Sequence, residues 1–431
     1  MRTTIVWFKT DLRLEDNETL IKAIAQSDSI IPLYCIEDNH FVTTTFGFKK
    51  TGSFRAQFLF ESLIDLDTHL RALGSGLLVV KGKPEIEIPK IVLRYKATKV
   101  VAKREVSYDE KQTELAVQAA LFKLKCEFQT FSTSTMYHAE DLPFSIKDIP
   151  DVFTNFRKKT EQDATIRAAF KMPTNIHSPE IETLCLPSLE SLDLKYTPMD
   201  KRAAIHFKGG ATEAIARLNH YFFESKCISE YKETRNGLVG ADYSSKFSAW
   251  LALGCISPRF IYQELKSYEA QFGANDSTYW LVFELLWRDY FRFMMKKYTT
   301  KFFQQAGIQS KGIPVNKHNT EQLQNWIDGN TGVDFVDANM IELKLTGFMS
   351  NRGRQNVASY LCNDLKLDWR YGAAYFEQQL IDYDVCSNWG NWAYLAGVGN
   401  DPRGNRYFNI DKQAADYDKN KRYRNLWLVK E

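Results

Sequence analysis

The first 132 residues alternate between short apolar runs and longer segments with helical periodicity. Five runs rich in β-branched and aromatic residues predict strands, at residues 3–8, 29–36, 77–81, 99–103 and 126–132. Between the second and third runs, apolar residues recur at helical spacing from Phe54 to Leu73. Strands that alternate with helices are typical of a parallel, doubly wound sheet with right-handed crossovers. We therefore expect an α/β domain over residues 1–134.

Proline marks the next segment as a connector. Six of the twelve prolines fall between residues 141 and 200, a density that interrupts helices and strand pairing. Helical patterns then follow one another, at residues 211–225, 247–268, 278–298, 320–328, 333–346, 352–365 and 372–381. Eight of the nine tryptophans also lie after residue 249. We expect an interdomain linker over residues 135–200 and a helical domain over residues 201–431.

Composition and charge narrow the class of protein only slightly. A formal net charge of +3 over 431 residues permits an anionic partner without requiring one. The seven cysteines are scattered and never spaced as CxxC, so we expect no disulfide framework and no metal site. This usage fits a reducing, cytoplasmic location. The sequence has no secretory leader and no apolar run long enough for a membrane span, and the turn after the first strand lacks the GxGxxG of nicotinamide sites.

Residues 376–399 (FEQQLIDYDVCSNWGNWAYLAGVG) combine two aspartates with tryptophans, tyrosines and amides in a segment too apolar for a solvated loop. Asp382 and Asp384 end a helical run, and acids among aromatic residues are rarely buried without partners. The neighbouring polar groups are amides, indoles and phenols, which suit a planar redox cofactor better than acid–base or nucleophilic catalysis. An aromatic core with incidental acids is the alternative.

Residues 279–297 form a segment that is apolar nearly all round and predicts a buried helix. Glu284, Trp287 and Arg288 share one face of this helix. Arg288 lies one turn after Glu284 and can satisfy its carboxylate, which is a purely structural interpretation. A functional role for Glu284 remains equally open at this point.

Residues 349–357 place Asn351, Arg354 and Gln355 on one helical face, and Arg354 is the expected partner of Asp382. A polar loop before another predicted helix bears hydroxyls and one lysine, at Ser244, Ser245, Lys246 and Ser248. Such groups at a helix N-terminus make a diphosphate site, although serine caps many helices that bind nothing.

Five segments, taken in order along the chain, carry a family resemblance: WFKTDLRLEDN, SSKFSAWLALGCISPR, FELLWRDYFRF, TGFMSNRGRQNVAS and DYDVCSNWGNWAYLAGVGNDPRGNRYFN. The sequence resembles the photolyase and cryptochrome flavoproteins over nearly its whole length, and is closest to their cryptochrome-DASH branch. The resemblance implies an N-terminal α/β domain and a C-terminal helical domain that binds FAD in a bent conformation.

Residue by residue, the resemblance implies a cofactor site and an electron path. The implied cofactor residues are Tyr231, Ser244, Ser245, Lys246, Phe247, Ser248, Arg288, Asn351, Arg354, Asp382, Asp384 and Asn388. Arg354 and Asp382 would pair beside the isoalloxazine, and the Asn388 amide would face flavin N5 without titrating. Trp392, Trp369 and Trp326 match the tryptophans that carry electrons between the flavin and the surface, with core packing as the alternative.

The resemblance also implies a pocket for a flipped-out cyclobutane pyrimidine dimer. Its residues would be Glu284, Trp287, Asn351, Arg352, Gln355 and Tyr394. Gln355 and Tyr394 stand where many duplex-repairing relatives carry Met and Trp, so we expect single-stranded DNA to be preferred. RNA and looped duplex remain open as substrates. The absence of histidine after His318 argues against a (6-4) photolyase.

In the first domain, Glu105 matches the acid that holds a 5,10-methenyltetrahydrofolate antenna, although it can equally cap the fourth strand.

We expect a monomer with no membrane partner. A blue-light photoreceptor is the alternative function, and it is disfavoured because the sequence ends four residues after Trp427, without a long extension. A sugar-nucleotide transferase would instead use Asp382 and Asp384 as a metal-binding DxD motif.

Overall fold

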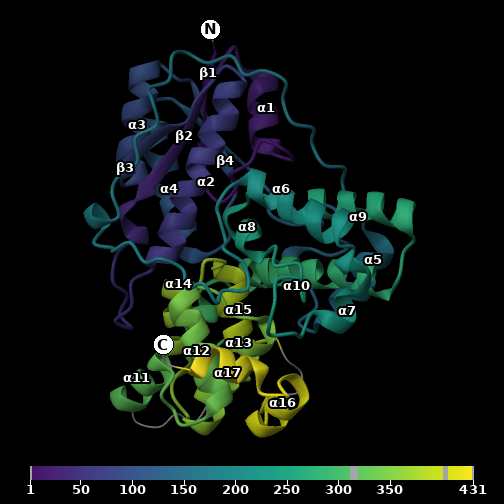
Figure 1. The fold of residues 1–431 in the computed structure, drawn as a ribbon. Coiled ribbons are helices and arrows are strands. Elements are labelled where there is room, and N and C mark those ends of the chain that lie inside the picture. Colours follow the sequence, from purple (N-terminus) through teal and green to yellow (C-terminus); the bar gives the residue numbers. More distant parts are fainter. Residues whose placement is uncertain (1, 311–318, 401–405, 430–431) are drawn as a thin grey trace.

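The computed structural model describes residues 2–310, 319–400 and 406–429, and these form an α/β domain above a helical domain (Figure 1). The α/β domain has one five-stranded parallel sheet in the order β3-β2-β1-β4-β5. Its strands are β1 (Thr3–Phe8), β2 (Ser29–Glu37), β3 (Leu78–Gly82), β4 (Lys99–Lys103) and β5 (Glu127–Phe131). The fold class and the five strands predicted from the apolar runs are confirmed.

Helices cover both faces of the sheet, as the doubly wound pattern predicts. They are α1 (Glu18–Gln26), α2 (Ser53–Ala72), α3 (Pro84–Tyr95) and α4 (Tyr108–Lys123). In β1, Val6 and Phe8 belong to the core shared with α1 and α2, whereas Ile5 and Trp7 belong to the core shared with α3 and α4. Because both faces are covered, the strand reads as a continuous apolar run.

The segment predicted as a linker is largely extended but contains a helix, α5 (Phe153–Asp163). The helical domain follows, with α6 (Ala211–Asn219), α7 (Tyr231–Thr234), α8 (Ser248–Leu253), α9 (Pro258–Phe272), α10 (Asp276–Tyr298), α11 (Thr320–Asp328), α12 (Asp334–Thr346), α13 (Asn351–Ser359), α14 (Trp369–Gln379), α15 (Val385–Leu395), α16 (Ile410–Tyr417) and α17 (Arg422–Leu428). Single π-turns extend α6 (His220–Glu224) and α13 (Tyr360–Asp364), and short 3-10 turns span Asp38–His40, Ile146–Asp148, Glu190–Leu192, Cys227–Glu230 and Thr299–Phe303. None of the helices in the described residues has the length and apolar character needed to cross a membrane.

Two helix predictions need correction. The helix predicted over 247–268 is two helices, because Gly254 ends α8 with a φ of +66° and Pro258 begins α9. A side chain at Gly254 would also meet the Thr10 carbonyl oxygen at 2.3 Å, so the break brings the two domains together. The second correction concerns Asp384, which does not end a helical run but caps the N-terminus of α15.

A buried ion network joins the two domains near this break. Asp16 is fully buried and accepts bonds from Arg259 at 2.7 Å and 3.1 Å and from the Ser257 hydroxyl at 2.6 Å. Arg13, which is also buried, donates to the Asp16 carbonyl oxygen and to the Gly254 carbonyl oxygen, both at 2.9 Å. The buried Asp16 carboxylate is thus paired with Arg259, and Arg13 ties the Asp16 and Gly254 backbones together across the domain boundary.

We expect Asp16→Ala to lower the free energy of unfolding by about 3 to 5 kcal/mol, because it leaves Arg259 buried without its carboxylate. Urea denaturation of the full chain measures this change. Asp193→Asn is the matched control, since it breaks an exposed pair with Lys49 and should leave the midpoint unchanged. Equal midpoints for both variants and the parent chain would show that the buried network contributes nothing to stability.

Candidate functional site

A cavity of about 260 Å³ lies within the helical domain and is called here the helical cavity. Its wall is built from the loop before α8 and from α7, α10, α13, α14 and α15. Eleven of the twelve residues that the sequence analysis assigned to a cofactor line it: Tyr231, Ser244, Ser245, Lys246, Phe247, Ser248, Asn351, Arg354, Asp382, Asp384 and Asn388. Segments more than 150 residues apart in sequence therefore meet at one cavity, from Tyr231 to Asn388.

The predicted partnership of Arg354 and Asp382 is confirmed. The Arg354 Nη2 atom donates to both carboxylate oxygens of Asp382, at 2.8 Å and 3.0 Å, and Nε donates to the Met349 carbonyl oxygen at 2.9 Å. The Asp382 side chain is only 2% exposed. This pair fixes a cation in the cavity wall, where a planar polar ligand can be held against it.

Lys246 provides a second cation, and its amine has no hydrogen-bond partner among the described residues. Its backbone has a φ of +57° and its side chain is buried, with Nζ 3.2 Å from the centre of the Tyr243 ring. Burial holds the pKa of the Lys246 amine well below its usual range. The contribution of the α8 N-terminus to anion binding is small, because α8 has only six residues and its dipole is short. Lys246 is therefore the residue of this loop whose side chain is free to meet an anionic ligand.

Asp384 and Asn388 lie on the opposite wall, at the start of α15. The Asp384 carboxylate accepts from the Ser387 backbone at 2.8 Å. Burial raises the pKa of Asp384, but Arg288, Arg292 and the hydrogen bonds from Ser387 together outweigh burial and hold that pKa below its usual value. The Asn388 amide nitrogen donates to the Ala373 carbonyl oxygen at 3.0 Å, which leaves its oxygen to accept from a ligand.

Glu284 lines the cavity but does not pair with Arg288, so the structural interpretation made from sequence was wrong. Glu284 pairs instead with Arg235 at 2.7 Å. Arg288 donates to the Ser134 carbonyl oxygen at 2.5 Å and to the Leu251 carbonyl oxygen at 3.3 Å, outside the cavity wall. Burial raises the pKa of Glu284, and Arg235 opposes that rise. Sequence analysis missed Arg235, whose only signal was its position one turn after Tyr231.

Gln355 and Asn351 line the cavity as expected, but the other three residues assigned to a lesion lie beside it. Trp287 stacks on Phe153 of α5 with ring centres 3.6 Å apart, and meets Tyr394 edge-on at 5.8 Å. One indole face is therefore already covered by the linker helix. Arg352 donates to the Asn236 side chain at 2.9 Å.

The three tryptophans expected to form an electron path do not form one continuous row. Trp392 lines the cavity and meets Trp326 edge-on at 6.2 Å, whereas Trp369 packs against Trp389 at 5.8 Å. Trp326 and Trp369 are fully buried and Trp392 is 2% exposed. The expectation that this set reaches the surface was wrong.

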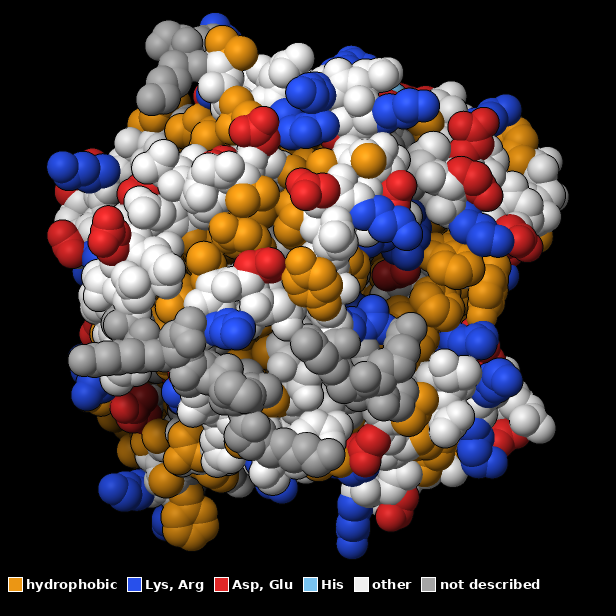
Figure 2. Space-filling model, turned by 90° about the horizontal axis from the view of Figure 1, so that it is seen from below, with side chains coloured by type: hydrophobic (Ala, Val, Ile, Leu, Met, Phe, Trp, Pro, Cys, Tyr) orange, Lys and Arg blue, Asp and Glu red, His pale blue; other side chains and the backbone are white. Residues whose placement is uncertain are grey.

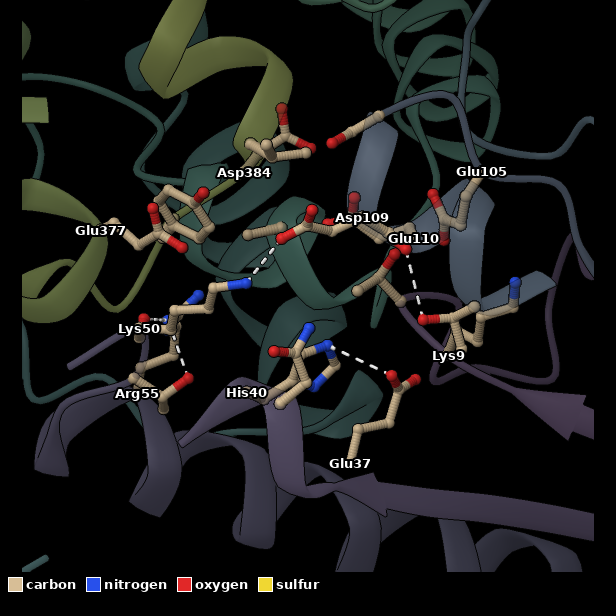
Figure 3. Close-up of a pocket in the computed structure, with 18 of the residues that line it drawn as sticks. Lys9, Glu37, His40, Lys50, Arg55, Glu105, Asp109, Glu110, Glu377 and Asp384 are labelled. Carbon is tan, nitrogen blue, oxygen red and sulfur yellow. Dashed lines mark hydrogen bonds and ion pairs between the residues drawn. The ribbon is translucent and has the colours of Figure 1, made fainter. Parts of the chain in front are cut away.

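A second cavity of about 430 Å³, called here the strand-end cavity, lies at the carboxyl ends of β1, β2 and β4 (Figure 3). Glu105 lies in its wall, paired with Lys103 at 3.1 Å and Arg292 at 3.0 Å. Burial raises the pKa of Glu105, but the two cations outweigh it and lower that pKa to about 2. Glu105 is therefore an ionised acceptor in this wall.

Figure 3 shows how acids surround the strand-end cavity, with Asp384 above, Glu377 beside Lys50, Asp109 paired with Lys50, and Glu37 with His40 below. Glu110 also lines it, and its Oε2 atom is buried without a hydrogen-bond partner in the described part of the chain. Within residues 2–310, 319–400 and 406–429, no three His, Cys, Asp or Glu residues form a metal-binding group. Asp382 is engaged by Arg354, which argues against a DxD metal motif.

Two family models and several relatives match this chain. Residues 280–430 match the FAD binding domain of DNA photolyase, and residues 4–176 match DNA photolyase. Cryptochrome DASH from Gloeobacter violaceus is 49% identical over 428 residues, covering 99% of this chain and 85% of that protein. Cryptochrome DASH from Xenopus laevis is 49% identical over 432 residues, covering 99% and 82%.

Two solved structures extend the comparison. The crystal structure of a Synechocystis cryptochrome superposes with a TM-score of 0.96 at 49% identity, covering 99% of this chain and 89% of that one. A bacterial class III photolyase from Agrobacterium tumefaciens shares the fold, with a TM-score of 0.85 at 24% identity and coverage of 99% and 86%.

The site depends on a close approach between Gly372 and the Trp392 ring, where a Cβ atom would lie 2.2 Å from the indole. Gly→Ala within a helix is ordinarily stabilising, but here we expect Gly372→Ala to cost about 1 to 3 kcal/mol through overpacking. The free energies of unfolding of Gly372→Ala, of Trp392→Phe and of the double variant measure the energetic coupling between the two positions. The smaller Phe ring should restore part of the loss, and additive effects would contradict the contact.

Proposed function

Since this chain belongs to the cryptochrome-DASH family of the photolyases, we propose that it is an FAD enzyme that uses light to split cyclobutane pyrimidine dimers in single-stranded DNA. The single observation that carries the proposal is the helical cavity, which brings together an unpartnered lysine, the ion pair of Arg354 with the buried Asp382, and the Asn388 amide. Reduced FAD, when bound, supplies the electron that light transfers to the dimer.

The donors and acceptors of the cavity fit FAD by charge. Lys246 is a buried cation without a partner, and a diphosphate supplies the anion that it lacks. Arg354 is held by Asp382 and can meet polar edges of a flavin ring, while Asn388 presents an oxygen that cannot act as a base. Trp392 lines the cavity, and its indole can pass an electron to a cofactor bound there.

Glu284 and Arg235 suit the recognition of a pyrimidine dimer beside that cofactor. With its pKa raised by burial, Glu284 can donate to a dimer carbonyl when protonated, or accept from N3–H when ionised. Its partner Arg235 then faces the negative charge that develops on the substrate. Figure 2 shows Lys and Arg side chains spread among hydrophobic ones over the lower face of the molecule, a mixture that suits phosphates and bases together.

The energy needed to flip a dimer out of a duplex favours single-stranded DNA as the substrate. Flipping a dimer out of a duplex costs a few kcal/mol, which the pocket must return through stacking worth about 1 to 3 kcal/mol per base. Here Trp287 has one face covered by Phe153, and Gln355 brings an amide into the wall. A pocket with so little free aromatic surface suits a flexible strand that needs no flipping.

We propose that the strand-end cavity holds an antenna, 5,10-methenyltetrahydrofolate. In doubly wound sheets ligands bind outside the carboxyl ends of the strands, where the strand order reverses, and β1 and β4 meet at such a point. The ionised Glu105 and the unpartnered Glu110 oxygen are acceptors for the N–H groups of a pterin. Tyr383 and Asp384 line both cavities, so an antenna would lie one side-chain layer from the flavin.

We further propose that the chain acts as a monomer in the cytoplasm, where its seven cysteines remain reduced. All seven are free thiols in the structure. Relatives from Arabidopsis thaliana and Solanum lycopersicum are described as chloroplastic or mitochondrial, and those compartments are the alternative location.

We expect Asp382→Ala to lose most of its FAD, because Arg354 is then left unpaired beside the cofactor at a cost of about 3 kcal/mol. The ratio of flavin to protein absorbance after purification measures occupancy. Asp328→Asn is the matched control, since it breaks an ion pair with Lys344 on the surface of the same domain and should keep its flavin. Full occupancy in the Asp382→Ala variant would contradict the assignment of the cavity.

We expect dimers in a single-stranded oligonucleotide to disappear faster under blue light than in the matched duplex, at subsaturating enzyme and with reduced flavin. Glu284→Gln should keep its FAD yet lower repair about tenfold or more, because one charge-assisted hydrogen bond to the dimer is lost. Rising salt should weaken binding of both oligonucleotides. Equal repair of strand and duplex would refute the preference, and no repair with flavin bound and reduced would favour a blue-light photoreceptor.

A further inference from the structure

The linker helix α5 lies beside α10 and brings a buried ring against one of its tryptophans (Figure 1). Phe153, the first residue of α5, is 5% exposed. Its ring stacks on the Trp287 indole of α10, with ring centres 3.6 Å apart and planes 13° apart. Trp287 itself is only half-buried. Phe153 therefore backs an indole that is still partly open to solvent.

The other rings around Trp287 meet it at an angle. Tyr290 and Tyr394 meet the indole edge-on, at 5.7 Å and 5.8 Å, and Phe291 contacts it at 5.5 Å with the planes tilted by 32°. Among the residues that the structure describes, no second ring is stacked on this indole. Phe153 is thus the ring whose flat face sets the plane of Trp287. The angle of 72° between Trp287 and Tyr394 follows from that plane.

Hydrogen bonds to α10 hold α5 in place on both sides of Phe153. Before the helix, the Tyr290 hydroxyl of α10 donates to the Asp151 carbonyl oxygen at 2.6 Å. One turn after Phe153, the Arg157 guanidinium donates to the Tyr279 hydroxyl of α10 at 2.7 Å. Because both flanks are tied to α10, Phe153 is a fixed support for the indole.

We infer that Phe153 is a positioning residue for the substrate. By stacking on one face of Trp287, it holds the indole in the plane in which the opposite face stacks on a base of the dimer. A side chain that is already held loses little conformational freedom when a ligand binds, so more of the contact energy appears as affinity. Phe153 acts only through Trp287. The inference rests on the proposed binding of a pyrimidine dimer against Trp287 and Tyr394.

This role predicts a loss that is specific to damaged DNA. An undamaged strand is held mainly through its phosphates, and those contacts do not depend on the plane of Trp287. A dimer is held in addition by stacking on the indole. Removing the ring of Phe153 should therefore lower the preference for a damaged strand and leave general binding of DNA intact.

The test compares Phe153→Met with Phe156→Met in the full chain. Met nearly conserves the volume of Phe but has no flat ring, so both variants should fold and keep their FAD. Phe156 is the matched control, since it lies one turn later in α5 and is fully buried. It packs on Phe153 and, within the described residues, has no ring contact with Trp287. Fluorescence anisotropy in the dark measures affinity for single-stranded oligonucleotides with and without one thymine dimer.

We expect Phe153→Met to weaken binding of the damaged strand about three- to tenfold, which is the range for loss of one aromatic pair, and to leave binding of the undamaged strand unchanged. Phe156→Met should change neither affinity. In a Trp287→Leu background, Phe153→Met should cause no further loss, because the residue through which it acts is gone. Equal losses from Phe153→Met and Phe156→Met would show that α5 supports only the fold, and would overturn the inference.

The parent chain separates the inference from the proposed function. Equal binding of damaged and undamaged strands by the parent would overturn the proposed substrate and the inference with it. A preference that survives Phe153→Met would overturn the inference alone. Fluorine NMR of the parent labelled with fluorotryptophan needs no variant of Phe153, because the Trp287 line is assigned by its loss in Trp287→Phe. We expect one sharp line without DNA, and a line broadened by exchange would overturn the inference.

Discussion

The ion pair between Arg354 and Asp382 is the contact around which the helical cavity is built. Arg354 lies on α13 and Asp382 lies in the turn between α14 and α15, so the pair holds three elements at a fixed separation. The Ile381 backbone bonds to the Gly347 carbonyl oxygen at 2.9 Å and strengthens the same junction. Because the Asp382 carboxylate is buried against Arg354, separating the turn that carries it from α13 would leave a charge unpaired at a large cost.

The apolar pattern of the sequence predicted the strands, and the position of acids among aromatic residues predicted one ion pair. The strands were recognised because both faces of the sheet are covered and each strand is a continuous apolar run. The pairing of Arg354 with Asp382 was also recoverable, since an acid among aromatic residues requires a cation and few were available. The α8–α9 break was missed because the apolar periodicity continues through Gly254. Its left-handed conformation ends α8, and its lack of a side chain allows the close approach of Thr10.

Contacts between distant segments were the part that sequence could not supply. Glu284 had a cation one turn away in Arg288, yet the fold turns Arg288 toward two backbone carbonyls and brings Arg235 to the carboxylate. Phe153 stacks on Trp287 from α5. This helix lies in the segment whose prolines had predicted a linker without helices. A helical spacing identifies the face on which a residue lies, but it does not identify the element that meets this face.

One stripe of α10 connects the electrostatics of both cavities. Glu284, Arg288 and Arg292 follow one another at intervals of four residues, and each engages a different wall. Glu284 reaches the mouth of the helical cavity, Arg288 and Arg292 lower the pKa of Asp384 between the cavities, and Arg292 holds Glu105 at the strand ends. This arrangement explains why α10 is apolar nearly all round and yet keeps three charged residues on one line. Arg292 is buried and Glu284 and Arg288 are half-buried, and each is paired or hydrogen-bonded to a different segment of the chain.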